Sequence, residues 1–323
     1  MKKFLLASAG KCYVLTLVLF CTYLTSFSQY SERVSFWEAG VTVGPSNFLG
    51  DLGGNYGIGR PFLKDNNIQM TKLTFGGHAS YHPSEFFAFR LAINIGSLEG
   101  DDAIIKGKGG FEEARRARNS NFKSKLKEAI VVAEFYPGVF LEYEPEDIYH
   151  KWRPYVLAGV GVFHFNPMGS DPTTGEWVAL KPLRTEGQGF AEYPDRKEYK
   201  LTQLNIPIGG GIKYYISERS NLSMEIIHRT TFTDYIDDVS TRYIDPNLFY
   251  QYRPQYYTTQ TAALADRMAN KSGTTGTRFA PGKKRGTPDN NDAYYSVGFK
   301  FSTRIGAGSD SRWNNSTRCP VRF

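Results

Sequence analysis

The 323-residue chain is rich in aromatic residues, which make up 15% of it as 21 Tyr, 23 Phe and 4 Trp, and it contains 32 glycines. Many aromatics and glycines with few long apolar runs favour twisted β-structure over helices. The formal net charge of +7 is modest for this length and does not indicate a nucleic-acid partner.

The N-terminus has the features of an export signal. Three lysines accompany an apolar stretch at 13–27, and the small residues Ser26 and Ser28 occupy the −3 and −1 positions of a cleavage site. A retained membrane anchor is the alternative, but a spanning helix needs about 20 apolar residues. Removal of a signal peptide at 1–28 lowers the net charge from +7 to +4. It leaves Cys319 as the remaining cysteine, so no internal disulfide and no cysteine-based metal site is expected.

The rest of the chain contains eight segments in which apolar and polar side chains alternate. Alternation over about 9–11 residues is typical of a strand that crosses a membrane. The clearest segment is the last, while the fifth is apolar on both sides and its two faces stay unassigned. In chain order the segments lie at 36–43 and at about 70–82, 86–97, 128–143, 154–165, 200–216, 221–235 and 293–305.

The connections alternate in length as well. The linkers after the second, fourth and sixth segments are short, at 82–85, 144–153 and 217–220, and the other four are long. A soluble β-sandwich also has alternating strands, but it has no reason to collect its long loops at one end. We therefore predict an all-β, OmpA-like transmembrane barrel of eight antiparallel strands in the outer membrane, spanning 29–305. Its four long loops would be extracellular and both termini periplasmic, with a C-terminal tail at 306–323.

The polar faces of these segments carry charges of both signs. An eight-stranded barrel is only wide enough for side chains to fill, and buried charges need partners. We expect structural ion pairing in the lumen, with a proton or ion path as the alternative. The predicted network comprises Glu38, Arg90, Glu134, Glu225, Arg229 and Lys300.

Two long loops have distinctive compositions. The loop at 98–127 contains the helix-favouring stretch 112–118 and then Lys123, Lys125 and Lys127, which suggests a basic helix that contacts lipopolysaccharide phosphates or an acidic partner. A solvated surface helix is the alternative. The loop at 238–292 is expected to hold a helix at 261–271 and an exposed aromatic contact surface. Its aromatic residues are Tyr243, Phe249, Tyr250, Tyr252, Tyr256 and Tyr257.

No catalytic, cofactor or metal site is predicted. Of the five histidines only His78 and His82 share a segment, and the other three lie elsewhere, so no set of three metal ligands is indicated. Ser223 and His228 are five residues apart on one segment, so they point to opposite faces. The Gly209-Gly210-Gly211 run lies inside a strand pattern rather than before a helix, which indicates a bend and not a phosphate loop. We therefore expect that the protein is not an enzyme.

Three stretches carry a resemblance to a known family. They are Glu38–Leu52 with its Asn-Phe-Leu-Gly-Asp-Leu ending, Thr233–Ser240 with Tyr-Ile-Asp-Asp-Val-Ser, and Arg285–Tyr295 with Arg-Gly-Thr-Pro and Asp-Ala-Tyr-Tyr. Together they resemble the PorG family of outer-membrane barrels from the Bacteroidetes. The resemblance implies a non-enzymatic component of type IX secretion, and of the gliding machinery in species that glide. It also implies that the barrel ties a periplasmic ring, built from a lipoprotein and its partner, to the outer membrane.

The periplasmic face offers few places for such a partner. An interface needs on the order of 20–30 residues per side, so the turn at 144–153 and the tail from Gly306 are the candidates. Aromatic residues commonly anchor protein contacts, and the candidate anchors are Tyr149, Trp152, Trp313 and Phe323. An OmpA-like adhesin or surface-binding barrel that uses its long loops is the alternative function.

Overall fold

A computed structural model describes the chain over most of its length. The described residues are 35–52, 68–105, 109, 112–142, 151–217, 219–274 and 276–305. The chain divides into two compact units, Met1–Ser35 and Phe36–Phe323, and every described strand and helix lies in the second. The expected signal peptide at 1–28 and tail at 306–323 lie outside the described residues.

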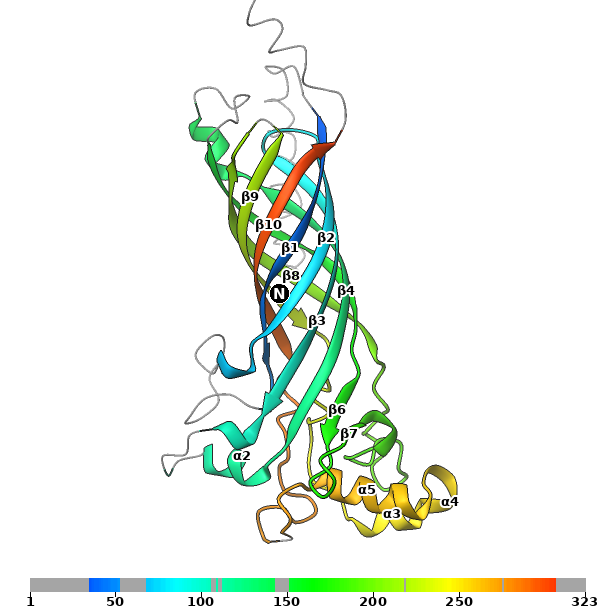
Figure 1. The fold of residues 1–323 in the computed structure, drawn as a ribbon. Helices are drawn as coiled ribbons and strands as arrows, with labels where there is room; N and C mark the ends of the chain where they lie inside the picture. The colour runs from blue at the N-terminus through cyan, green and yellow to red at the C-terminus, as the bar shows by residue number, and fades with distance from the viewer. Residues whose placement is uncertain are drawn as a thin grey trace, which may run out of the picture. The chain divides into compact units, whose positions relative to one another are not determined.

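Eight long strands form the body of the second unit (Figure 1). Their residues alternate between β-branched or aromatic side chains and small or polar ones, a pattern that suits a sheet with two different faces. The strands are β1 (Phe36–Leu49), β2 (Lys72–His82), β3 (Phe87–Asp101), β4 (Asn121–Phe135), β5 (Trp152–His164), β8 (Thr202–Tyr215), β9 (Ser220–Thr231) and β10 (Ala293–Ile305).

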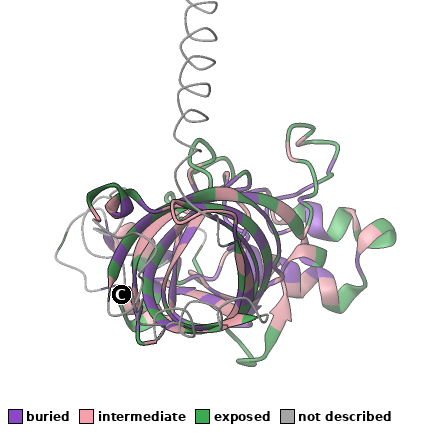
Figure 2. Cartoon of the chain, turned by 90° about the horizontal axis from the view of Figure 1, so that it is seen from above, coloured by how far each residue is buried: buried purple, intermediate pink, exposed green. Residues whose placement is uncertain are grey.

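The sheet closes on itself. Each barrel strand pairs antiparallel with its neighbours in the order β3-β2-β1-β10-β9-β8-β5-β4, and β3 also pairs with β4 along its whole length. The view along the axis shows the resulting ring of strands (Figure 2). Closure leaves no free edge among these eight strands, as a lipid environment requires. The predicted fold, an eight-stranded antiparallel barrel of the OmpA type, is confirmed.

Inward and outward side chains alternate as the sequence pattern predicts. On β3, Phe89 and Leu91 are each 53% exposed, whereas Ala88 and Arg90 are buried in the barrel. β5, whose faces the sequence left unassigned, follows the same rule. Beyond the buried Arg153 near its start, the inward face of β5 is formed by Tyr155, Leu157, Gly161 and Phe163. An apolar stretch of lumen therefore explains why both faces of this segment looked alike.

The boundaries of several predicted strands were wrong: β1 extends to Leu49 instead of ending at 43, and the largest error concerns β4. β4 begins at Asn121 and ends at Phe135, so the prediction of a strand to position 143 fails. Pro137 lacks the backbone N–H that a ladder needs, and Pro137–Leu141 instead forms a 3₁₀ helix, η5. Val139 is buried there and Leu141 is 91% exposed, so they do not share a lipid face. By contrast, β10 occupies the predicted range.

The short connections β2–β3, β4–β5 and β8–β9 lie at one end of the barrel and the long ones at the other (Figure 1). The described residues contain no helix that is long and apolar enough to cross a membrane. The elements of the long connections are η3 (Ile68–Met70), η4 (Asp102–Ile104), α2 (Glu112–Arg118), β6 (Pro167–Ser170), β7 (Trp177–Ala179), η6 (Lys181–Leu183), α3 (Asn247–Gln251), α4 (Arg253–Tyr256) and α5 (Thr259–Ala269).

The loop helices occur near their predicted positions, but the predicted basic helix is shorter than expected. α2 ends at Arg118, whose side chain is buried, and Lys123, Lys125 and Lys127 belong to strand β4 rather than to a loop. In the last loop, α5 spans Thr259–Ala269, so both of its ends lie two residues earlier than those of the helix predicted at 261–271. Thr258 caps α5 by accepting a hydrogen bond from the Thr261 amide at 3.2 Å.

The aromatic cluster of the last loop is mostly buried, so the expectation of an exposed aromatic surface is wrong. Phe249 and Tyr257 are buried, and only Tyr250 among the cluster is clearly exposed, at 43%. The rings pack on Phe190 from the preceding long connection, which stacks on Tyr252 with ring centroids 4.2 Å apart. The two loops thus share a hydrophobic core of their own, apart from the barrel.

Candidate functional site

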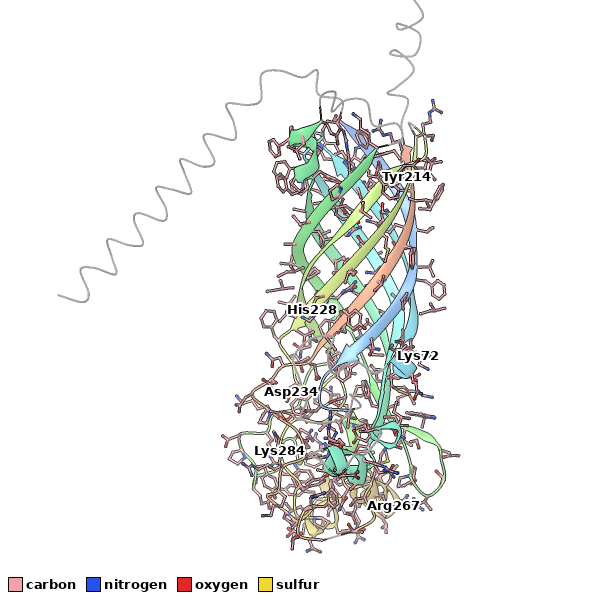
Figure 3. All side chains as sticks on the ribbon, turned by 90° about the vertical axis from the view of Figure 1, so that its left-hand side faces the viewer. Lys72, Tyr214, His228, Asp234, Arg267 and Lys284 are labelled. Atoms are coloured by element: carbon pink, nitrogen blue, oxygen red, sulfur yellow. The ribbon has the colours of Figure 1, made fainter. Side chains whose placement is uncertain are left out.

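A continuous apolar surface surrounds the outside of the barrel. At the short-turn end its border is formed by pairs of aromatic rings on neighbouring strands, and Figure 3 shows Tyr214 at that end, away from Arg267 of the loops. The pairs, with centroid separations, are Trp37–Tyr81 at 5.0 Å, Phe87–Phe135 at 5.1 Å and Trp152–Tyr214 at 4.5 Å. An outward apolar band bordered by an aromatic girdle is the mark of a barrel embedded in lipid. The protein is an outer-membrane β-barrel.

The middle of the lumen holds four charged side chains from four strands. Arg90 of β3 lies 3.2 Å from Glu134 of β4 and 2.8 Å from Glu225 of β9. Lys300 of β10 lies 2.9 Å from Glu225 and 3.8 Å from Glu134. The Tyr155 hydroxyl also donates to Glu225, at 2.8 Å. All are buried, so two cations compensate two carboxylates where water is scarce.

Two further groups lie along the lumen. Glu38 does not join the central group, because it pairs with Lys213 at 3.0 Å and contacts His82 at 3.2 Å. Arg229 pairs with Glu128, at 3.1 Å. Glu128 was not among the predicted network residues, although it lies six positions before Glu134 and hence on the same face of the strand.

Side chains fill most of this interior. A cavity of about 20 Å³ lies between the central group and the Arg229 group, with His78, Arg90, Asn94 and Arg229 among the residues that line it. Such a volume holds about one water molecule. His78 is fixed there by a 2.9 Å hydrogen bond between its Nε2 and the Ser302 hydroxyl. At this level the described side chains fill the lumen, and the barrel has no wide pore.

The second candidate site lies where the long connections meet the barrel. Four aspartates, which we call the acid cluster, come together from the ends of β1, β9 and β10: Asp51, Asp234, Asp237 and Asp292. Figure 3 shows Asp234 between the barrel strands and the loops. These residues belong to the three stretches that carry the family resemblance. The stretches are far apart in the sequence: Leu52 and Asp237, which are hydrogen-bonded, are separated by 185 positions.

Backbone amides hold the acid cluster in place. Asp237 accepts from the amides of Leu52 at 3.0 Å and Val239 at 2.9 Å. Asp292 accepts from the Ile236 amide at 2.8 Å. One carboxylate therefore ties β1 to the last loop, and another ties that loop to β10. Among the described residues, no three His, Cys, Asp or Glu side chains are arranged to hold a metal ion.

The charges of the acid cluster are poorly compensated. Asp234 is 6% exposed, and among the described residues no cationic side chain pairs with it, although the Ser240 side chain interacts with its carboxylate. Burial, and then the neighbouring Asp237, raise the pKa of Asp234 to about 9. Burial also raises the pKa of Asp237 and of Asp292 well above the usual range, with repulsion from the other aspartates as a further cause. The site therefore keeps protons that an exposed cluster would release.

Two buried arginines surround the acid cluster and connect the loops to one another. Arg118 of α2 pairs with Asp102 at 2.7 Å and donates to the backbone carbonyls of Asp51 at 2.7 Å and Arg285 at 2.6 Å. Arg285 pairs with Glu186 at 2.8 Å, and Glu186 also accepts from the amides of residues 240 and 241. All four long connections are thus joined through a few charged side chains.

The chain is similar to one family model and to several solved barrel structures. Residues 14–171 match a family model described as a domain of unknown function, DUF6089. No curated protein sequence matches. Among solved structures, the chain is similar to the attachment invasion locus protein Ail of Yersinia pestis in complex with the heparin analogue sucrose octasulfate. Identity is 6%, coverage 84% of this chain and 99% of that chain, and the TM-score 0.35.

Two barrels of Pseudomonas aeruginosa give similar values. The N-terminal β-barrel domain of OprF is 10% identical, with 83% of this chain and 97% of that chain covered and a TM-score of 0.31. The outer membrane protein OprG is 8% identical, with 85% and 98% covered and a TM-score of 0.34.

The predicted partner-binding residues are placed only in part. Tyr149, Trp313 and Phe323 lie outside the described residues. Trp152, expected in a turn, is instead the first residue of β5 and points outward with 62% exposure, packed against the tilted ring of Tyr214 in the aromatic girdle. Its position suits the membrane boundary as well as a protein contact.

Proposed function

We propose that this protein is a non-enzymatic scaffold barrel of the type IX secretion machinery, which ties a periplasmic ring complex to the outer membrane. The filled lumen carries the proposal, because charged pairs and aromatic rings occupy the space that a diffusion pore would need. The likeness of three sequence stretches to the PorG family supplies the identity of the machinery, and those stretches meet in one buried acid cluster.

In this proposal the short turns and both termini face the periplasm, and the long connections face the outside. A ring protein would then dock at the turn end. Two apolar side chains are exposed there on η5, Phe140 at 62% and Leu141 at 91%. Phe140 contacts Phe86 of the neighbouring turn with centroids 4.6 Å apart, so the two turns together offer an apolar surface. Apolar residues in that position favour a protein partner.

The test is a pull-down of the tagged, full-length barrel from detergent-solubilised outer membranes, with the co-purifying proteins identified. Ring proteins are expected in the eluate of the wild type and lost from a variant that combines Leu141→Asp, Trp152→Ala and deletion of 309–323. Trp37→Ala is the matched control, because Trp37 lies in the same aromatic girdle away from η5. Full retention of the ring proteins by the combined variant rules out this docking face. Their absence from the wild-type eluate rules out the scaffold function.

A surface-binding barrel is the second candidate, and the ordered loops favour it. The loop core formed around Phe190 and Phe249 holds α3 and α5 against the preceding connection, so the loops present a fixed surface. Replacing α3–α5 by a short linker separates the two functions. A scaffold keeps its ring partners after this change, whereas a surface receptor loses its extracellular ligand.

A further inference from the structure

A strip of basic side chains lies on the outward face of β4, next to the apolar band. Lys125 and Lys127 are both exposed and precede Ala129 and Val131 on the same face of the strand. Alternate residues of a strand are roughly 7 Å apart, so the two ammonium groups can approach one ligand together. The strand thus changes within two residue steps from a lipid-facing surface to a basic one.

Two acidic side chains of neighbouring elements are engaged with other partners. Glu99 of β3, which lies opposite Lys123, pairs with Lys72 at 2.8 Å. Asp171 beyond the end of β6 pairs with Arg267 at 2.9 Å. No ion pair joins Lys125 or Lys127 to any residue in the part of the chain that the structure describes.

The described cross-strand neighbours of Lys125 and Lys127 include no acidic residue. Lys127 lies opposite Ile95 of β3 and His164 of β5, and Lys125 lies opposite Ser97. His164 in turn lies opposite Thr202 of β8, and its ring contacts that hydroxyl at 3.0 Å. The outward surface here offers hydrogen-bond donors and positive charge.

The register also fixes the height of the strip relative to the apolar band. Ile95 is the last of five outward apolar residues on β3, and Val162 is the last on β5 before His164. Lys127 lies opposite Ile95 on one side and opposite His164, two residues beyond Val162, on the other. A lysine at this level can lay its alkyl chain along the apolar band and extend its ammonium group into the headgroup layer.

We propose that Lys125 and Lys127, with His164 beside them, bind the phosphate groups of the lipid in the leaflet around the loop end. If the long connections face the outside, as in the proposed function, this is the outer leaflet with its phosphorylated lipopolysaccharide. The preference for a phosphorylated lipid rests on the strip alone. The site would hold the barrel at a fixed depth and orient it among anionic lipids.

Native mass spectrometry of the full chain in detergent tests this proposal. The probes are bis-phosphorylated lipid A and the same lipid after enzymatic dephosphorylation. Wild type is expected to retain the phosphorylated lipid at concentrations on the order of tenfold lower than the dephosphorylated one. Lys125→Gln with Lys127→Gln should remove that difference, and Lys125→Arg with Lys127→Arg should restore it. The control variant is Lys283→Gln with Lys284→Gln, which changes the charge equally but within the last loop.

Three outcomes overturn the proposal. They are equal retention of the two lipids by wild type, an undiminished preference in the glutamine variant, and full displacement of the lipid by millimolar inorganic phosphate. The last result would mean that the strip binds free phosphate rather than a lipid. Because both lipids are presented in detergent, the outcome does not depend on which way the barrel faces in the cell or on whether a ring protein binds.

Discussion

Carboxylates are buried in two regions of this molecule, and each region stabilises them differently. In the lumen, Glu134 and Glu225 are compensated by Arg90 and Lys300 within 3.8 Å. In the acid cluster at the loop junction, Asp234 has no such partner among the described residues and is kept neutral by a raised pKa. The first region depends on opposite charges, and the second on the binding of protons.

This difference predicts opposite responses to the same kind of substitution. Removing one carboxylate from a compensated group leaves a cation buried without its partner, which costs free energy. Neutralising one carboxylate in a crowded acidic group relieves repulsion. Mutations and pH changes therefore separate the two regions, although both connect strands that are far apart in the sequence.

The largest effect is expected for Glu225→Leu in the lumen. Arg90, Lys300 and the Tyr155 hydroxyl all lose their contact with this carboxylate. The free energy of unfolding should fall by about 3–5 kcal/mol, as when one partner of a buried pair is removed. It is measured by guanidinium titration of the barrel in lipid vesicles. Ser223→Ala, two residues away on the same inward face, is the control and should change little. An unchanged midpoint for Glu225→Leu would contradict the pairing.

A smaller effect is expected for an uncompensated charge on the outside. Phe299 points to the lipid with 52% exposure, two positions from Phe301 on the same face. Phe299→Arg should lower the free energy of unfolding by about 2–4 kcal/mol if the residue lies near the membrane midplane. Thr303→Arg, closer to the turn end of β10, should cost clearly less in the same titration. Equal costs at the two positions would mean that the apolar band is not centred on Phe299.

The acid cluster should respond in the opposite direction. Asp234→Asn removes a carboxyl group that folds only in its protonated form and replaces it with a neutral group of the same shape. We expect the loop junction to become more stable at pH 8 by roughly 1–3 kcal/mol. Hydrogen exchange of the amides of Leu52 and Ile236 reports this local stability, since both donate to the cluster. Faster exchange in the variant would show that the Asp234 carboxylate is instead ionised in the folded chain and stabilises the junction by accepting hydrogen bonds.

The pH dependence of the wild-type junction follows from the same shift. Asp234 has a pKa of about 9 in the folded chain against an ordinary value of 3.8. Its contribution to stability is therefore complete below about pH 4 and declines as the pH rises through about 9. Exchange at Ile236, corrected for its intrinsic pH dependence, should show more protection at pH 6 than at pH 9. Asp234→Asn should flatten this profile, and a profile unchanged by the substitution would rule out Asp234 as its source.

The strand pattern could be read from the sequence because each strand has one face toward lipid and one toward the lumen. β10 shows this in full, from Tyr295 to Ile305. β4 was misplaced at both ends because its first outward residues, including Lys125, look like loop residues, and because the apolar residues of η5 look like a continued strand. Alternation of polarity therefore identifies a membrane strand only over the part that contacts lipid.

The acid cluster could not be predicted in this way. It depends on contacts such as that between the Leu52 amide and Asp237, which no local pattern specifies. The same holds for Phe190, whose packing against Phe249 turned a predicted exposed surface into a core. Glu128 is different, because its spacing from Glu134 placed it in the lumen and only its partner Arg229 was assigned to the network. For Glu128 the sequence indicated the inward face of the strand, but it did not indicate that Arg229 is its ion-pair partner.

The smallest effect tests whether burial or distance decides the strength of an ion pair. Lys72 and Glu99 lie 2.8 Å apart on β2 and β3, almost the same separation as the 2.9 Å between Lys300 and Glu225. Their side chains are 37% and 28% exposed, whereas those of the lumen pair are 3% and 6% exposed. Because water screens the exposed pair, Lys72→Met should lower the free energy of unfolding by less than about 1 kcal/mol, and 0.5 M salt should abolish even that. Lys300→Met should cost several times more in the same guanidinium titration, and added salt should leave most of that loss in place, since the lumen excludes the ions that screen. Similar losses for the two methionine variants would mean that distance alone sets the strength of these pairs, and the distinction between a compensated lumen and a solvated rim would fail.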